Sequence, residues 1–453
     1  MPSTEARRSP GRSFRLCALA VLLLLSGFAI AQTTHPKAAN SSSPSSWKLT
    51  AVKVAGSQRY QASEVISATG LQIGQTVTEE DFQRASQRLG QAGAFDNVTY
   101  NFRYSSAGAQ LELQVTDAGQ WVPARFENFV WFPDQELRTT LHRQVPLFDG
   151  MLPLSGGLVD QVSDALQVLL LQRKIPGRAD YLRAGPENGP INAIVFSVTG
   201  PNIRIRSVAF NGAGPGELPA LNALGKQLAG REYSRSLLLI QASKNFLPVF
   251  LAHGYLKAAF AEAQAKVVDE STGDDNQERT NVDATFQVEP GRQYKLASLE
   301  WSGNKALSVD QLQPLVHLQA GQPANAVKLN ADVEAIEKLY GTRGYVTVKV
   351  HPTPQFKETE STVSYRLEVR EGDVYHMGEI EIQGLDDRDA RQVLAKWSLP
   401  KGDIYDSSYA KRFLDDAFKT ALLDERWNVR VSEDPDLKEK TVDVTLRFSR
   451  KSS

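Results

Sequence analysis

The chain has 453 residues, of which 41% are hydrophobic and 23% are charged, and its formal net charge is −1. A chain of this length exceeds what a single hydrophobic core supports, so several domains are expected. The balanced charge and the lack of a long basic block argue against a nucleic-acid partner, because phosphate binding requires clustered lysine and arginine.

The N-terminus has the pattern of an export signal. Basic residues precede an apolar run from Leu16 to Ile30 that closes on Ala-Ile-Ala, the small-x-small pattern of signal-peptidase sites. We therefore predict a cleavable signal peptide at 1–31 and a Ser/Pro-rich linker at 32–47. The alternative is an uncleaved anchor, although this run is shorter than the roughly 20 residues a bilayer requires. Cleavage also removes Cys17, the only cysteine, so no disulfide is expected.

Strand and helix signals alternate through the next 70 or so residues. Leu49–Val54 is predicted to be a strand, followed by a short helix capped by Ser63. Thr78 caps a second helix, whose apolar residues share one face, and Gly93 allows the chain to turn left-handed and end that helix. Two alternating segments follow, the first at Val98–Tyr104, and they predict a hairpin.

A joint between such segments recurs along the chain. "VEPGRQYKLASLEWSGN" (288–304) and "VREGDVYHMGEIEIQGL" (369–385) align closely, with Gly291 and Tyr294 matching Gly372 and Tyr375. Weaker copies occur upstream, and the joint glycines recur every 81 to 91 residues. The longer spacing holds a polar insertion, "DESTGDDNQERTN", which we interpret as a long hairpin loop. A regular period of this kind indicates tandem units.

A glycine-aromatic pair marks a second repeated position. Gly254-Tyr255 and Gly344-Tyr345 each follow a helical pattern and precede an alternating one, as Gly93 does in the first unit. Each glycine is expected to end the second helix and let the chain reverse, and the aromatic to hold that helix end against the sheet. The fifth unit has "DERW" (424–427) at this position.

Together these patterns predict an α+β protein built as a tandem array. Each unit would have the order β-α-α-β-β, with a three-stranded mixed sheet covered by two helices. The second unit is atypical and the third contains the polar insertion. The predicted units are 48–117, 120–199, 202–290, 292–371 and 373–450.

This order, the Gly-Tyr pair and the joint resemble the polypeptide-transport-associated (POTRA) domain. Five copies behind a signal peptide resemble the periplasmic part of outer-membrane β-barrel assembly factors. Those factors carry a membrane barrel after the last unit, whereas this chain ends a few residues after "KTVDVTLRF". The resemblance therefore implies a periplasmic arm that reaches the outer membrane through a partner. Its expected partners are a membrane barrel protein and unfolded outer-membrane clients.

Chemical motifs are lacking. The six histidines are scattered, and the sequence has no zinc-protease motif, cysteine pair, phosphate-binding loop or nucleophile elbow. We therefore expect no catalytic residue, no cofactor and no metal. An enzyme hidden in the atypical second unit is an alternative, and its "FVWFPDQ" (129–135) is alternatively a partner-binding patch.

Binding is instead expected through the main chain. A sheet edge offers unpaired N–H and C=O groups to an extended polypeptide. The resemblance implies that the second strand of each unit is this edge, although these edges could also only pack against neighbouring units. The candidate binding residues are Val98, Tyr100, Phe102, Leu256, Phe260, Val346, Val348, Val350, Val429 and Val431.

The leading functional hypothesis is a periplasmic polypeptide-binding and docking protein of outer-membrane barrel assembly. It would act by strand addition at exposed sheet edges and by docking to a membrane barrel partner. The main alternative is a membrane-anchored scaffold of the division type, which would handle no clients.

Overall fold

The computed structural model describes residues 45–272, 278–420, 423 and 426–451. The predicted signal peptide and nearly all of the predicted linker lie outside the described residues. So do the middle of the polar insertion and part of "DERW". Within the described part, no helix is long and apolar enough to cross a membrane.

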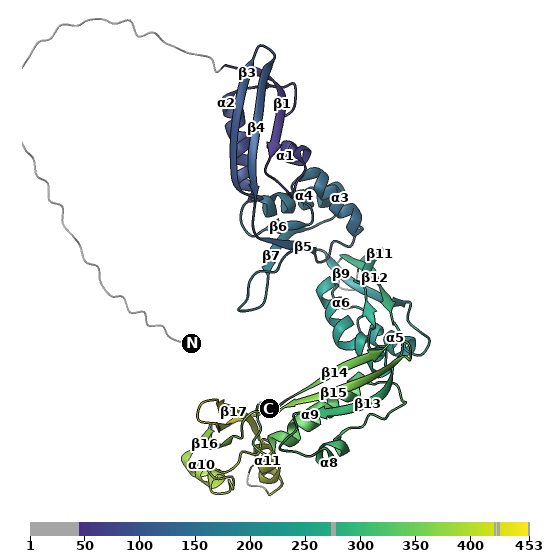
Figure 1. The fold of residues 1–453 in the computed structure, drawn as a ribbon, viewed down its shortest axis with the longest axis vertical. Coiled ribbons are helices and arrows are strands. Elements are labelled where there is room, and N and C mark those ends of the chain that lie inside the picture. The colour runs from purple at the N-terminus through teal and green to yellow at the C-terminus, as the bar shows by residue number, and fades with distance from the viewer. Residues whose placement is uncertain (1–44, 273–277, 421–422, 424–425, 452–453) are drawn as a thin grey trace, which may run out of the picture.

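Five sheets follow one another along the chain, from the purple β1 to the yellow end at β18 (Figure 1). We number the units 1 to 5 after these sheets. In unit 4 the order is β13-β15-β14, with β13 parallel and β14 antiparallel to the central β15. The same mixed pairing recurs in the other four sheets, so the predicted α+β fold class is confirmed.

The elements of units 1 and 2 follow the predicted order. Their bounds are β1 (Trp47–Ala55), α1 (Ala62–Thr69), β2 (Thr76–Val77), α2 (Glu79–Ala92), β3 (Phe95–Ser105), β4 (Gly108–Asp117), β5 (Trp121–Phe126), α3 (Asp134–Gln144), β6 (Met151–Pro153), α4 (Leu158–Gln172), β7 (Arg178–Ala184) and β8 (Ala193–Thr199). Each of these two units carries one short strand, β2 or β6, that the sequence interpretation did not include.

Units 3 to 5 have the same plan. Their bounds are β9 (Asn202–Asn211), α5 (Leu218–Lys226), α6 (Arg235–Gln241), the π-helical turn η1 (Ala242–Phe246), α7 (Leu247–Ala252), β10 (Ala259–Phe260), β11 (Gln264–Thr272), β12 (Glu278–Glu289), β13 (Lys295–Ser302), α8 (Val309–Leu312), η2 (Gln313–Leu315), α9 (Ala326–Gly341), β14 (Lys349–Lys357), β15 (Thr362–Arg370), β16 (His376–Gln383), α10 (Asp387–Leu394), α11 (Tyr409–Lys419), β17 (Trp427–Asp436) and β18 (Thr441–Arg450). Helices α6, η1 and α7 run on without a break and together take the place of one second helix.

In unit 3 the short β10 pairs with β12 as a fourth strand, so the expectation of three strands per sheet was wrong there. It was also wrong for units 1 and 2. The segment between their two helices lies antiparallel to the first strand and pairs with it as β2 or β6. In units 3 to 5 the same segment makes one isolated bridge, such as His376 with Ile404. A glycine starts this segment in "GQTV", "GREY", "GQPA" and "GDIY", a repeated signal that the sequence interpretation missed.

Most helix ends lie where the sequence predicted them. Thr78 caps α2 in a capping box with Asp81, and Gly93 ends it in the left-handed conformation. Ser63 does not cap α1 as predicted, because the helix begins at Ala62, two residues earlier than that cap implies. Gln61 is extended and forms the capping box with Glu64, which places Ser63 inside the first turn.

The polar insertion is not simply a long loop. Strands β11 and β12 continue into it, with pairs such as Glu270 with Thr280 and Thr272 with Glu278. The insertion therefore lengthens the hairpin itself.

The hydrophobic residues form four core clusters rather than five separate ones. Units 3, 4 and 5 each have their own cluster, whereas units 1 and 2 share one. Tyr60 lies at this junction, where its ring contacts Phe95 and Trp121 and its hydroxyl donates to the carbonyl of Leu147 at 2.8 Å. Units 1 and 2 are therefore packed as one body.

Candidate polypeptide-binding surfaces

The second long strand of every unit lies at the edge of its sheet. Among the residues that the structure describes, β3, β7, β14 and β17 each pair with a single strand, and β11 pairs with β12 alone. Val98, Tyr100 and Phe102 lie in β3, and Val429 and Val431 lie in β17. These five candidate residues therefore occupy edge strands.

Three candidate residues are misplaced in the sequence interpretation. Leu256 and Val346 lie in turns, and Val348 precedes β14, because the second strands begin only at Ala259 and Lys349. Leu256 packs against the core of unit 4, and Val346 packs against the core of unit 5. These two side chains therefore join consecutive units and are not part of a free edge. Phe260 lies in the short β10 and packs against the core of unit 3.

The Gly-Tyr pairs build the same contact at two junctions. The carbonyl of Gly254 accepts from the N–H of Tyr294, and that of Gly344 accepts from Tyr375, both at 2.8 Å. Tyr294 and Tyr375 are the buried tyrosines of the joints, each 1% exposed. The two repeated motifs, separated by 30 to 40 residues, are therefore the two halves of one inter-unit contact.

The glycines at these junctions have no room for a side chain. Gly344 has a φ of +88°, and a Cβ atom there would lie 2.8 Å from the carbonyl oxygen of Tyr375. Gly254 has a φ of +83° and would place its Cβ 2.6 Å from the oxygen of Tyr294. Gly93 similarly lies against Ser155 of unit 2. The glycines thus end the helices as predicted and also let the next unit approach the main chain.

The aromatic residues beside these glycines contact their own helices. Tyr345 meets Tyr340 of α9 edge-on with ring centroids 5.7 Å apart, and Tyr255 meets Phe250 of α7 at 6.1 Å. Gly291 and Gly372 of the joints are also left-handed, with φ of +69° and +73°. The pairing of Gly254 with Tyr294 and of Gly344 with Tyr375 could not be identified from the sequence, because each tyrosine comes from the following unit.

β14 is closed to strand addition by its own residues. The N–H of Val350 donates to Oε1 of Glu337 on α9 at 3.0 Å and therefore points away from β15. Main-chain groups alternate along an antiparallel strand, so Pro352 and Pro354 also face the free edge. Proline has no N–H, and prolines on edge strands block unwanted pairing. Val350 thus lies on an edge strand that offers no free main-chain N–H at positions 350, 352 and 354.

β7 is closed in part. The N–H of Ala179 donates to Oε1 of Gln167 on α4 at 2.9 Å. This bond has the same geometry as that between Val350 and Glu337, with a side chain of the second helix capping the start of the second strand. β17 carries Pro435 near its end and three exposed carboxylates there, at Glu433, Asp434 and Asp436.

β3 is the contrasting open edge. Its 11 residues include no proline, and within the described residues its only strand partner is β4. Phe102 contacts Phe82 of α2 with ring centroids 5.4 Å apart, and Tyr104 stacks on Trp47 at 3.7 Å. Tyr104 is nevertheless 41% exposed, and Tyr100 is half-buried. A half-exposed aromatic face therefore lies beside the unpaired main chain of β3.

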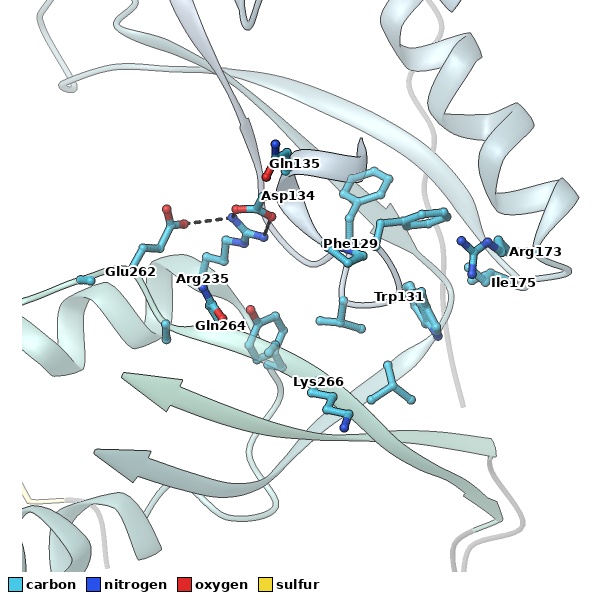
Figure 2. Close-up of a pocket in the computed structure, with 18 of the residues that line it drawn as sticks. Phe129, Trp131, Asp134, Gln135, Arg173, Ile175, Arg235, Glu262, Gln264 and Lys266 are labelled. Atoms are coloured by element: carbon cyan, nitrogen blue, oxygen red, sulfur yellow. Dashed lines mark hydrogen bonds and ion pairs between the residues drawn. The ribbon is translucent and has the colours of Figure 1, made fainter. Parts of the chain in front are cut away.

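A cleft of about 1150 Å³ lies between units 2 and 3 (Figure 2). One wall is the "FVWFPDQ" loop, and the other is the segment from Ala261 to Val267, which includes the start of the edge strand β11. Val130 of the loop is buried in the core of unit 3, and Trp131 packs against the cores of both units. The conspicuous aromatic loop is therefore an inter-unit element that also lines the cleft.

An arginine holds this cleft in shape. The guanidinium of Arg235 binds both carboxylate oxygens of Asp134, and its Nη1 also lies 3.2 Å from Oε1 of Glu262. Hydrogen bonding to Arg235 lowers the pKa of Asp134, and burial raises the pKa of the neighbouring Tyr233 to about 12. Figure 2 shows Arg235 between these two carboxylates, with Trp131 and Arg173 away from them. Ser236 adds two hydrogen bonds to Glu127 of unit 2, at 2.8 and 2.9 Å.

The described residues show no arrangement suited to metal chemistry. Within them, no group of three or more His, Cys, Asp or Glu side chains is placed to hold a metal ion.

Comparison with known proteins identifies one unit directly. The POTRA family model, described as a surface antigen variable number repeat, matches residues 294–372. A candidate outer membrane protein assembly factor of Treponema pallidum is 26% identical over 205 residues, which cover 45% of this chain and 24% of that protein. The outer membrane protein assembly factor BamA of Neisseria meningitidis is 23% identical over 167 residues, covering 35% of this chain and 20% of that protein.

The chain thus matches about a quarter or less of the length of these curated relatives. Among solved structures, POTRA domains 3–5 of Haemophilus influenzae BamA are 20% identical, with a TM-score of 0.42, over 55% of this chain and 96% of that one. Unit 4 spans the residues matched by the family model, and its mixed sheet order recurs in the other units. The family model thus identifies a POTRA domain in unit 4.

Proposed function

We propose that this protein binds extended polypeptide segments in the periplasm and takes part in outer-membrane β-barrel assembly. The sequence similarity to outer-membrane assembly factors supports the setting. The partner would be an unfolded barrel client, a membrane barrel protein, or both. The proposal assigns the protein no catalytic step, because its recognition chemistry is main-chain pairing.

The observation that carries this proposal is the contrast between β3 and β14. Both are edge strands, but two prolines and Glu337 close β14, whereas β3 has neither prolines nor a side-chain cap in the described structure. The half-exposed aromatic face beside β3 suits a strand with apolar residues at alternate positions. Barrel strands have this alternation, with apolar residues toward lipid and polar residues toward the lumen.

The test is site-specific photocrosslinking in cells. A crosslinker at the exposed Asn101 of β3 is expected to capture unfolded barrel proteins, and one at the exposed Thr353 of β14 is the matched control. The yield at position 101 should exceed that at position 353 by about tenfold, because β3 offers free N–H donors whereas positions 350, 352 and 354 of β14 offer none. Capture of no envelope polypeptide at either position would refute the function, and equal yields would refute main-chain pairing as its mechanism.

A second measurement tests whether binding requires apolar and polar residues to alternate along the bound polypeptide. A soluble peptide with alternating apolar and polar residues should compete for crosslinking at position 101. A scrambled peptide of the same composition should compete several-fold less well, because strand addition aligns alternate side chains on one face. Equal competition would mean that β3 binds unfolded chains without strand pairing.

A further inference from the structure

The cleft between units 2 and 3 combines a main-chain wall with a charged lining. β11 pairs with β12 on one side only, so its other side is free where it borders the cleft. The opposing aromatic loop is fixed in place by Val130 in the core of unit 3 and by Asp134 bound to Arg235. An extended segment entering the cleft would therefore meet a sheet edge and a rigid apolar surface at once.

The charges that line the cleft are unequal. Four cations line it, at positions 173, 174, 235 and 266, against the two carboxylates Asp134 and Glu262. Both carboxylates bind Arg235, and Arg173 binds Glu136 at 2.7 Å. This leaves Lys174 and Lys266 without a salt bridge among the described residues.

Lys266 lies opposite a carboxylate across the strand pair and helps to lower its pKa, but forms no salt bridge with it among the described residues. Asp283, its register partner on β12, accepts from Arg206 at 2.9 Å and from the hydroxyl of Ser207 at 2.6 Å. The cleft therefore has two ammonium groups available to an incoming carboxylate, one on each wall.

Lys174 occupies a backbone position that disfavours lysine. It follows the end of α4 with a φ of +56°, in the left-handed region where glycine or asparagine is usual. An L-residue with a Cβ is less stable than glycine in this conformation. Left-handed residues other than glycine gather at functional sites, and Lys174 lines the cleft.

We propose that this cleft binds an extended polypeptide segment bearing acidic side chains. The main chain of β11 sets its register, Trp131 packs against its apolar residues, and Lys174 and Lys266 bind its carboxylates. This inference rests on the proposed function and deepens it, because it assigns a charge preference to one binding site. Binding at this cleft also depends on two units together, because Lys174 belongs to unit 2 and Lys266 belongs to unit 3.

The test compares two labelled ten-residue peptides on the full chain by fluorescence anisotropy. Both peptides have the same alternating apolar residues, and one has Asp or Glu and the other Lys at the polar positions. The variant K174E/K266E should weaken binding of the acidic peptide by about tenfold or more and favour the lysine peptide. The control K226E/K244E makes the same change of charge at exposed lysines of unit 3 outside the cleft and should change the affinity less than twofold.

Location is tested separately. A photocrosslinker at Gln264, which lines the cleft from β11, should capture the acidic peptide in the natural background and lose it in K174E/K266E. Equal loss of affinity in both double variants would overturn the proposal, because net charge would then explain the effect. Displacement of the peptide by inorganic phosphate at matched concentration would also overturn it, in favour of a simple anion site.

The two proposals fail differently. If neither peptide binds the cleft but barrel clients are still captured at β3, only the charge-selective site is refuted. If neither the cleft nor β3 captures a polypeptide, the proposed function fails as well.

Discussion

Replacing Gly344 by alanine tests whether the repeated glycine holds consecutive units together. At a φ of +88° an alanine is disfavoured by roughly 1–2 kcal/mol in itself. Its Cβ would also lie 2.8 Å from the oxygen of Tyr375 and 3.0 Å from Cγ2 of Ile404, both in unit 5. Relieving this overlap strains or breaks the bond from the N–H of Tyr375, which adds about 1–3 kcal/mol.

Gly321 of the same unit provides the matched control. Its φ is +83°, but a Cβ added there would have no atom of the described residues within 4 Å, its own chain neighbours aside. G321A should therefore carry only the conformational cost. The difference between the two variants, about 1–3 kcal/mol, is the contribution of the inter-unit contact.

Amide hydrogen exchange is the suitable assay, because a chain of several units does not unfold in a single two-state step. The amide of Tyr375, which donates to Gly344, should exchange roughly 5- to 150-fold faster in G344A than in G321A. In G321A its exchange should change little. Equal acceleration in both variants, or none in G344A, would show that the glycine serves only to end α9.

Three further outcomes are expected. R235L removes the partner of Asp134 and should weaken the docking of units 2 and 3 by about 1–3 kcal/mol, seen as faster proteolysis between them. Because Arg235 lowers the pKa of Asp134, this docking should also weaken in the natural protein as pH falls below about 4. An unchanged contact at pH 3 would contradict this expectation. P352T/P354T restores two outward N–H groups on β14, so crosslinking at position 353 should rise toward that at position 101, and an unchanged yield would show that the prolines do not close the edge. Y60F loses a buried hydroxyl donor and should lower the free energy of unfolding of the first two units by about 0.5–1.5 kcal/mol in urea titration. Because burial raises the pKa of Tyr60, the natural protein should lose the stability that this neutral hydroxyl provides as pH rises above about 10. Y60F should lose less stability over the same pH range.

Local signals in the sequence identified the elements well. The cap at Thr78 and the glycine at the end of α2 were predicted, because caps and left-handed turns depend on residues within a few positions. The starts of the second strands were placed too early at Leu256 and Val346. Alternating apolar residues look alike whether they face their own sheet or the core of the next unit, so periodicity alone could not separate them.

The state of each edge was harder to predict. "HPTPQ" was visible, and its two prolines are a known signal of a blocked edge strand. Their direction was not visible, because it follows from the register of β14 on β15 and from the bond between Val350 and Glu337. The cleft was hidden for the same reason, since Asp134 and Arg235 are 101 residues apart.

The sequence by itself determined the order of elements, the period of the units and the positions of most caps. These properties depend on backbone dihedral preferences and on neighbours within a turn or a strand. Only the tertiary structure decided which sheet edges remain open, that units 1 and 2 share a core, and that Gly344 lies against Tyr375 of the next unit. Those outcomes depend on contacts between distant segments, whose geometry is fixed only when the units pack together.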